Sequence, residues 1–183
     1  MEINLPEPTD IQFISCISFA GFQELLQKHG VQGIELPSRD GCRLLCQVDQ
    51  PFGLVYFSQH ARSCYCAPKV QVPKIDWVVQ GSDDEGNCGG WDDVSVDYLN
   101  LPWIYQGCYA SMYDEPYYSE VLADPISCVN GCRSSDESLA MIPKKKGDGW
   151  LCACFDHPAE GVIGRKCGLG VWQGYYRRMR WVK

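Results

Sequence analysis

Apolar and polar residues alternate over short distances along the whole chain, which indicates short helices and strands rather than long ones. Residues 21–31 place apolar side chains at helical spacing, and they predict an amphipathic helix that ends at Gly30. Residues 117–124 hold the corresponding place in the second half of the chain, so we predict a shorter helix there. Two apolar runs, 54–57 and 139–142, predict strands.

Polar loops follow both predicted strands, at 58–63 and at 143–149, and each loop leads into a Cys-x-Cys stretch. This order predicts two β-hairpins. Ahead of each hairpin lies a Cys-x3-Cys stretch whose first residues favour the start of a short helix. The candidate caps are Ser38 and Asp40 in the first half and Asp124, followed by Pro125, in the second.

The same order of cysteines occurs twice along the chain, which indicates an internal duplication with a period of about 90 residues. Each half holds a lone cysteine, a Cys-x3-Cys pair, a Cys-x-Cys pair and a last cysteine. Proline breaks the strand pattern near residues 100–102, so we predict one domain over 1–99 and a second over 100–183. The repeated cysteines are Cys16, Cys42, Cys46, Cys64, Cys66 and Cys88, then Cys108, Cys128, Cys132, Cys152, Cys154 and Cys167.

The two cysteine pairs of each half have matching spacing. Residues four apart on a helix are separated by about 6 Å, and residues two apart on a strand by about 6.6 Å. Two disulfides can therefore join helix to strand without distorting either, although the direction of the helix is left open. The remaining cysteines pair as Cys16 with Cys88 and Cys108 with Cys167. An all-thiolate zinc site is the alternative, but structural zinc favours wider spacing in both pairs.

These elements predict an α+β protein of two small disulfide-rich domains, each a short helix or two on an antiparallel sheet.

Twelve cysteines in 183 residues is an even number and typical of an oxidising compartment. The net charge of −7 argues against a nucleic-acid partner. No apolar run approaches the roughly 18 residues of a membrane span. Residues 1–13 lack the basic start and apolar core of a signal peptide, so a secreted form would have lost its leader.

Four stretches together resemble the WSC domain, a cysteine-rich extracellular module: YQGCYASMYDEP, ISCVNGC, GWLCAC and CGLGV. The second half matches the family's opening at Gly107-Cys108-Tyr109, and the first half matches its close at Cys88-Gly89-Gly90. The resemblance covers nearly the whole chain as two tandem copies. The PAN/apple modules are similar in having a helix joined by disulfides to a pair of strands. It implies a secreted module that binds polysaccharide such as β-glucan, or a neighbouring protein.

The chain departs from the WSC pattern at several positions. Each half lacks the additional late pair of cysteines that the family commonly has, and Cys16 has neither the preceding glycine nor the following tyrosine. Ala67 and Phe155 stand where glycine usually follows the Cys-x-Cys pair. These departures weaken the inference that the family's ligand contacts are retained.

No residue pattern points to catalysis or to a cofactor. The histidines, His29, His60 and His157, do not fall at equivalent positions in the two halves. The GxSxG and HExxH motifs are absent, and the even number of cysteines leaves no spare nucleophile. The acidic stretch 82–87 lacks the spacing of a calcium loop, so we interpret it as a solvated loop. We therefore predict a protein without enzymatic activity, cofactor or bound metal.

Aromatic residues are the strongest candidates for ligand contact. Tyr113, Tyr117 and Tyr118 lie in a polar loop, and Trp150 follows a glycine-rich loop, so we predict that these four bind ligand. The alternative is that they fill the core, as Trp and Tyr do in small disulfide domains.

The leading hypothesis for the function is a secreted, monomeric protein that binds cell-wall polysaccharide. The second is a secreted effector or inhibitor that binds a partner protein.

Overall fold

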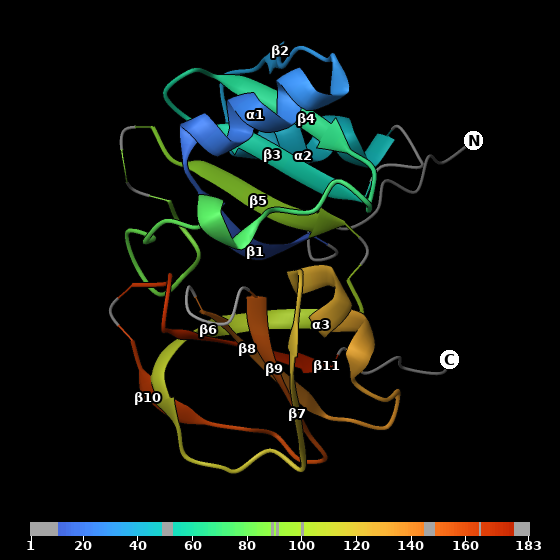
Figure 1. The fold of residues 1–183 in the computed structure, drawn as a ribbon, viewed down its shortest axis with the longest axis vertical. Coiled ribbons are helices and arrows are strands. Elements are labelled where there is room, and N and C mark those ends of the chain that lie inside the picture. Colours follow the sequence, from blue (N-terminus) through green and yellow to red (C-terminus); the bar gives the residue numbers. More distant parts are fainter. Residues whose placement is uncertain are drawn as a thin grey trace, which may run out of the picture.

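A computed structural model describes residues 11–48, 53–88, 90, 92–99, 101–144, 149–164 and 166–177. Within these ranges the chain forms two antiparallel sheets, three short α-helices and six disulfides (Figure 1). The fold is therefore α+β and disulfide-rich, as the sequence predicted. None of the helices in the described part of the chain is long and apolar enough to span a membrane.

The first sheet lies between two helices. Helix α1 (Phe19–His29) covers one face, where Phe22 stacks on Tyr56. Helix α2 (Arg39–Val48) covers the other face, and its cysteines contact Val55 and Phe57. A 3₁₀ turn, η2 (Ile75–Trp77), packs with α1. The strands, in spatial order, are β1 (Ile11–Ile17), β5 (Val94–Leu99), β3 (Leu54–Ser58), β4 (Ser63–Ala67) and β2 (Ile34–Glu35).

Both predicted helix starts and the predicted stop at Gly30 are present. The Ser38 hydroxyl accepts a hydrogen bond from the Gly41 N–H at the start of α2. Gly30 follows α1 in the left-handed conformation, at φ 62°, and its N–H bonds back to the last turn. In the second half, the Asp124 carboxylate accepts from the Ser127 N–H and caps helix α3 (Pro125–Gly131).

The second sheet repeats the first strand by strand. The order β1-β5-β3-β4-β2 has its counterpart in β6-β11-β8-β9-β7, with β10 added beside β6. Even a β-bulge is repeated, because the register shifts at Ile14, two residues before Cys16, and at Gln106, two residues before Cys108. The strands are β6 (Trp103–Met112), β7 (Tyr118–Leu122), β8 (Ser138–Lys144), β9 (Gly149–Phe155), β10 (Gly161–Ile163) and β11 (Trp172–Arg177).

The predicted helix over 117–124 is wrong, since residues 118–122 form the edge strand β7. Tyr118 lies opposite Cys154 and Leu122 lies opposite Trp150 in an antiparallel ladder with β9. Tyrosine and valine favour strands, and the free edge of β9 offers the main-chain partners that a short isolated helix would lack.

All twelve cysteines are paired, and each helix is joined twice to its strand. The structure resolves the open question of direction, because the first cysteine of each helix pairs with the first cysteine of the strand. Thiolates for zinc are therefore not available. The pairs are Cys42–Cys64, Cys46–Cys66, Cys128–Cys152 and Cys132–Cys154, together with the expected Cys16–Cys88 and Cys108–Cys167.

The two halves pack end to end, with β1 facing β6 and β11 (Figure 1). Gln173 donates a hydrogen bond through Nε2 to the Ile14 carbonyl at 2.9 Å, and the Tyr175 hydroxyl donates to the Phe13 carbonyl at 2.8 Å. The Tyr105 N–H donates to the Gln12 side chain at 2.8 Å. One cluster of buried side chains joins both halves, including Ile14, Ile17 and Trp77 from the first half and Trp103, Leu139 and Trp150 from the second.

We expect Tyr175→Phe to lower the free energy of unfolding by about 1–2 kcal/mol, because it leaves the buried Phe13 carbonyl without its donor. Urea denaturation followed by tryptophan fluorescence measures this, and a single transition is expected because the halves share a core. Tyr176→Phe, on the exposed side of the same strand, is the control and should change stability by less than about 0.5 kcal/mol. Equal losses in the two variants would contradict the role given to the Tyr175 hydroxyl.

Candidate functional site

The structure places three of the four predicted ligand-binding aromatics at the surface. Tyr113, Tyr117 and Tyr118 are 69%, 46% and 42% exposed, and together we call them the tyrosine surface. Trp150 is fully buried, so its predicted role in ligand contact is wrong. It is the second residue of β9 and lies on the same side of the strand as Cys152, which the disulfide with Cys128 on α3 directs into the shared core.

Tyr117 is held in place by three contacts although nearly half of its side chain is exposed. Its hydroxyl donates to the Asp136 carboxylate at 2.7 Å and accepts from the Arg133 Nε–H at 3.0 Å. The Arg133 guanidinium also lies 4.4 Å from the centre of the tyrosine ring. Partial burial and the Asp136 carboxylate raise the pKa of Tyr117, so the hydroxyl stays protonated at neutral pH. The ring is therefore pre-oriented at the surface.

The rest of the tyrosine surface is fixed by its neighbours. The Tyr113 N–H donates to the Glu160 carbonyl at 2.9 Å, which ties the β6–β7 loop to the segment before β10. His157 lies beside Asp114 and Asp156, and the pKa of its imidazole is raised by the hydrogen bond to Asp156 and by the Asp114 charge. The Tyr118 hydroxyl donates to Glu120. Carboxylates that accept hydrogen bonds thus surround the tyrosines.

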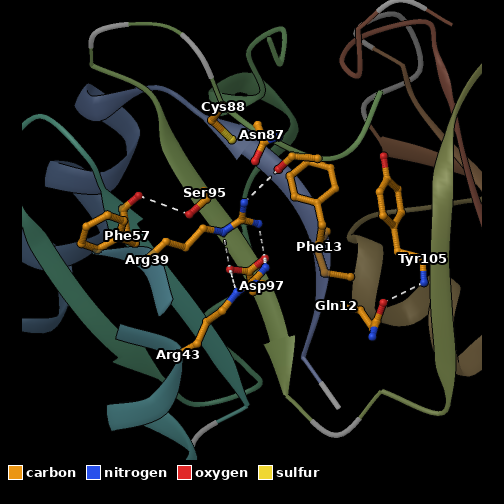
Figure 2. Close-up of polar contacts among 12 residues, drawn as sticks. Gln12, Phe13, Arg39, Arg43, Phe57, Asn87, Cys88, Ser95, Asp97 and Tyr105 are labelled. Atoms are coloured by element: carbon orange, nitrogen blue, oxygen red, sulfur yellow. Dashed lines mark hydrogen bonds and ion pairs between the residues drawn. The ribbon is translucent and has the colours of Figure 1, made fainter. Parts of the chain in front are cut away.

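A second candidate site, which the sequence analysis did not single out, is a polar cleft in the first half with a volume of about 340 Å³. It lies between the start of α2, the strands β3 and β5, and the loop that ends at Cys88. Figure 2 shows the guanidiniums of Arg39 and Arg43, the two lining residues that we call the floor of the cleft, converging on Asp97. The lining residues are Ser38, Arg39, Asp40, Arg43, Phe57, Gln59, Asn87, Cys88, Asp93 and Ser95.

Between the two arginines of the floor lies a fully buried carboxylate, that of Asp97, which does not itself line the cleft. Asp97 accepts from the Arg39 Nε–H at 2.9 Å and from the Arg43 Nε–H at 2.9 Å, and both guanidiniums make a second bond to its other oxygen. Burial disfavours the charged carboxylate, but the Arg39 and Arg43 charges and hydrogen bonds outweigh it, so the pKa of Asp97 is lowered. Two cations on one anion leave the floor with an excess positive charge.

The rim of the cleft is acidic. Asp40 is 93% exposed, and the Asp93 carboxylate accepts from the Gly90 N–H at 2.7 Å. Asp83 braces the adjoining loop by accepting from the N–H groups of Glu85 and Asn87. The cleft therefore combines a positive floor with a negative rim, which suits a ligand that presents oxygen acceptors inward and donors or cations outward.

Sequence signals for the cleft exist in retrospect. Arg39 and Arg43 are four residues apart and share one face of α2. Asp97 interrupts the otherwise apolar and small residues of β5, and a buried charge requires a partner. The pairing itself spans 58 positions along the chain, so only the fold brings these residues together.

Comparison of the chain with family models, with curated proteins and with solved structures gives no match.

Proposed function

We propose that this chain is a secreted, non-catalytic protein of two WSC-like modules that binds cell-wall polysaccharide through the tyrosine surface. The observation that carries the proposal is a set of three exposed tyrosines, two of which, Tyr117 and Tyr118, donate hydrogen bonds to carboxylates. A flat aromatic face offers a stacking platform to the apolar face of a sugar ring, and the neighbouring carboxylates accept hydrogen bonds from its hydroxyls. Six disulfides support an oxidising, extracellular environment.

Contacts that hold the tyrosine surface in place also support the proposal. Binding costs free energy when side chains must be ordered, and a ring that is already fixed avoids part of that cost. Tyr117 is fixed by Arg133 and Asp136, and the loop that carries Tyr113 is tied to Glu160. The disulfide Cys132–Cys154 anchors the strand beside β7. The ring of Tyr117 is therefore pre-oriented, and the main chain at Tyr113 is tied to its neighbour.

Retention on insoluble β-glucan, chitin and cellulose tests the proposal. We expect the wild-type protein to be retained on at least one of these polymers and a Tyr113→Ala/Tyr117→Ala variant to lose at least tenfold in affinity. Tyr117→Phe keeps the ring but loses the two hydroxyl bonds, so we expect it to retain most of the binding. Thermal denaturation of each variant establishes that it is folded.

The matched control is Tyr176→Ala, which removes an exposed tyrosine from the same half but outside the tyrosine surface. It should bind as the wild-type protein does. Absence of retention on all three polymers would overturn the proposal, and an equal loss in the control would show that the tyrosine surface is not the contact.

A further inference from the structure

One surface of the second half is covered by the first half. There β1 packs on β11 and beside the Cys108–Cys167 disulfide, and we call this covered surface the groove of the second half. Gln173 and Tyr175 donate hydrogen bonds to two consecutive main-chain carbonyls of β1, those of Ile14 and Phe13. The molecule thus shows one way in which this groove binds an extended polypeptide.

Main-chain contacts continue along the same groove. The Gly81 N–H donates to the Cys167 carbonyl at 2.7 Å, and the Cys167 N–H donates to the Asp83 carbonyl at 3.0 Å. The Cys108 N–H donates to the Asp84 carbonyl at 3.2 Å. All of these hydrogen bonds use backbone groups of the first half.

The cleft of the first half is the equivalent groove. Ser95 lies opposite Cys16 in the first sheet as Gln173 lies opposite Cys108 in the second. Cys88 closes the first groove by its disulfide with Cys16, as Cys167 does in the second. In place of Tyr175, the first half has Asp97, which lies opposite Phe13 as Tyr175 lies opposite Tyr105.

The two grooves differ in their lining. Counting from the first cysteine of each helix, α2 places Arg39, Asp40 and Arg43 where α3 has Pro125, Ile126 and Val129. The three residues of α3 are buried, and Ile126 and Val129 belong to the cluster that joins both halves, whereas the three residues of α2 line the open cleft. The covered side of the second half therefore has apolar residues where the open cleft of the first half has charged ones.

We propose that the cleft of the first half binds an extended, basic segment of a partner protein, in the way that the groove of the second half binds β1. Arg39 and Arg43 use only part of their N–H groups on Asp97 and on the Gly86 carbonyl, and the others are available to main-chain carbonyls of the partner. Asp40 and Asp93 at the rim match lysine or arginine side chains. The chain's net charge of −7 also steers a basic partner towards it.

The occupant is a different protein rather than a second copy. In a repeat of the internal contact, β6 of a second copy would enter the cleft, because β6 is the counterpart of β1. Tyr105, the β6 counterpart of Phe13, is already bonded to the first half of its own chain, through its N–H to Gln12 and through its hydroxyl to the Asp84 carbonyl. The following part of β6, Tyr109–Met112, pairs with β10. The β1 edge is covered by the chain's own second half.

Fluorescence anisotropy with three labelled heptapeptide pools tests this inference. Each pool alternates a fixed residue with a mixture of Val, Ile, Phe and Thr, and the fixed residue is Lys, Gln or Glu. At 150 mM salt we expect the Lys pool to bind at least tenfold more tightly than the Gln pool, and the Glu pool not to bind. The Lys pool should shift the amide resonances of Arg43, Asn87 and Ser95.

Two matched charge reversals show whether the peptide binds because of the cleft residues or because of the net charge of the protein. Asp40→Lys, at the rim, should weaken binding of the Lys pool at least fivefold. Asp76→Lys makes the same change of net charge on the opposite side of the sheet, in η2, and should change binding less than twofold. Equal effects of the two reversals, or absence of binding by the Lys pool, would overturn the inference.

Failure of the peptide inference and failure of the polysaccharide proposal can be told apart by experiment. The Tyr113→Ala/Tyr117→Ala variant should bind the Lys pool as the wild-type protein does, because the tyrosine surface lies in the other half. Soluble laminarihexaose should leave the resonances of Arg43, Asn87 and Ser95 unshifted. If this saccharide shifts them instead, the cleft binds sugar and the peptide inference is wrong.

Discussion

A Cys16→Ala/Cys88→Ala double variant is expected to lose about 4 kcal/mol of unfolding free energy, because this disulfide closes the longest loop in the protein. The two cysteines are 72 positions apart. On the chain-entropy model the stabilisation grows with the logarithm of loop length, and a loop of this size contributes about 4 kcal/mol. Urea denaturation at pH 7 without reductant measures the loss.

The Cys16–Cys88 disulfide also supports the contact between the halves. It lies in one buried cluster with Cys108, Cys167 and Phe13, and Phe13 meets the ring of Tyr105 edge-on at 5.4 Å. The Cys46→Ala/Cys66→Ala variant, whose cysteines are 20 positions apart, is the comparison and should lose about 3 kcal/mol. If the short loop proves as stabilising as the long one, loop entropy does not govern the contribution of these disulfides.

Asp97→Asn is expected to lower the free energy of unfolding by about 3 kcal/mol at pH 7, because it leaves two partly buried guanidiniums without their counter-charge. The wild-type contribution depends on pH in a defined direction. The pKa of Asp97 is lowered in the folded state, so its contribution is complete above the ordinary carboxyl pKa of about 4 and is lost as pH falls through the folded value.

Urea denaturation at pH 7 and at steps between pH 4 and pH 2 checks both parts of this expectation. The variant should be less stable at pH 7 and should lose less of its stability on acidification than the wild-type protein. Asp76→Asn, which removes an exposed carboxylate from η2, is the control and should change stability by less than about 0.5 kcal/mol. A variant as stable as the wild-type protein at pH 7 would contradict the structural role of the Asp97 carboxylate.

The disulfide framework could be predicted from local spacing alone. Cysteines four apart on a helix and two apart on a strand have matching separations, so pairing helix to strand follows from the geometry of each element. The direction of the helix could not be predicted, since both directions satisfy the same separations. It is decided by how α2 and α3 pack on their sheets, where Cys42 meets Cys64 and Cys128 meets Cys152.

The helix predicted over 117–124 and the ligand contact predicted for Trp150 are wrong because tertiary contacts determine the structure at both places. The helix predicted over 117–124 rested on the correspondence with residues 21–31, but the free edge of β9 selects the strand β7 there. Trp150 follows a polar loop, but the strand that begins there turns the ring into the shared core. For Tyr113 and Tyr117 the polar surroundings in the sequence do correspond to exposure in the structure. Their contact with polysaccharide stays a prediction.

The sequence by itself determined the duplication, the α+β class and which segments the disulfides join, because these depend on spacing within short stretches. Only the tertiary structure decided that one groove is filled by β1 while its equivalent stays open. That difference depends on groups far apart in the chain, such as Gln173 and the Ile14 carbonyl, or Arg39 and Asp97. Such contacts form only when the chain folds, since no local preference of either segment specifies its distant partner.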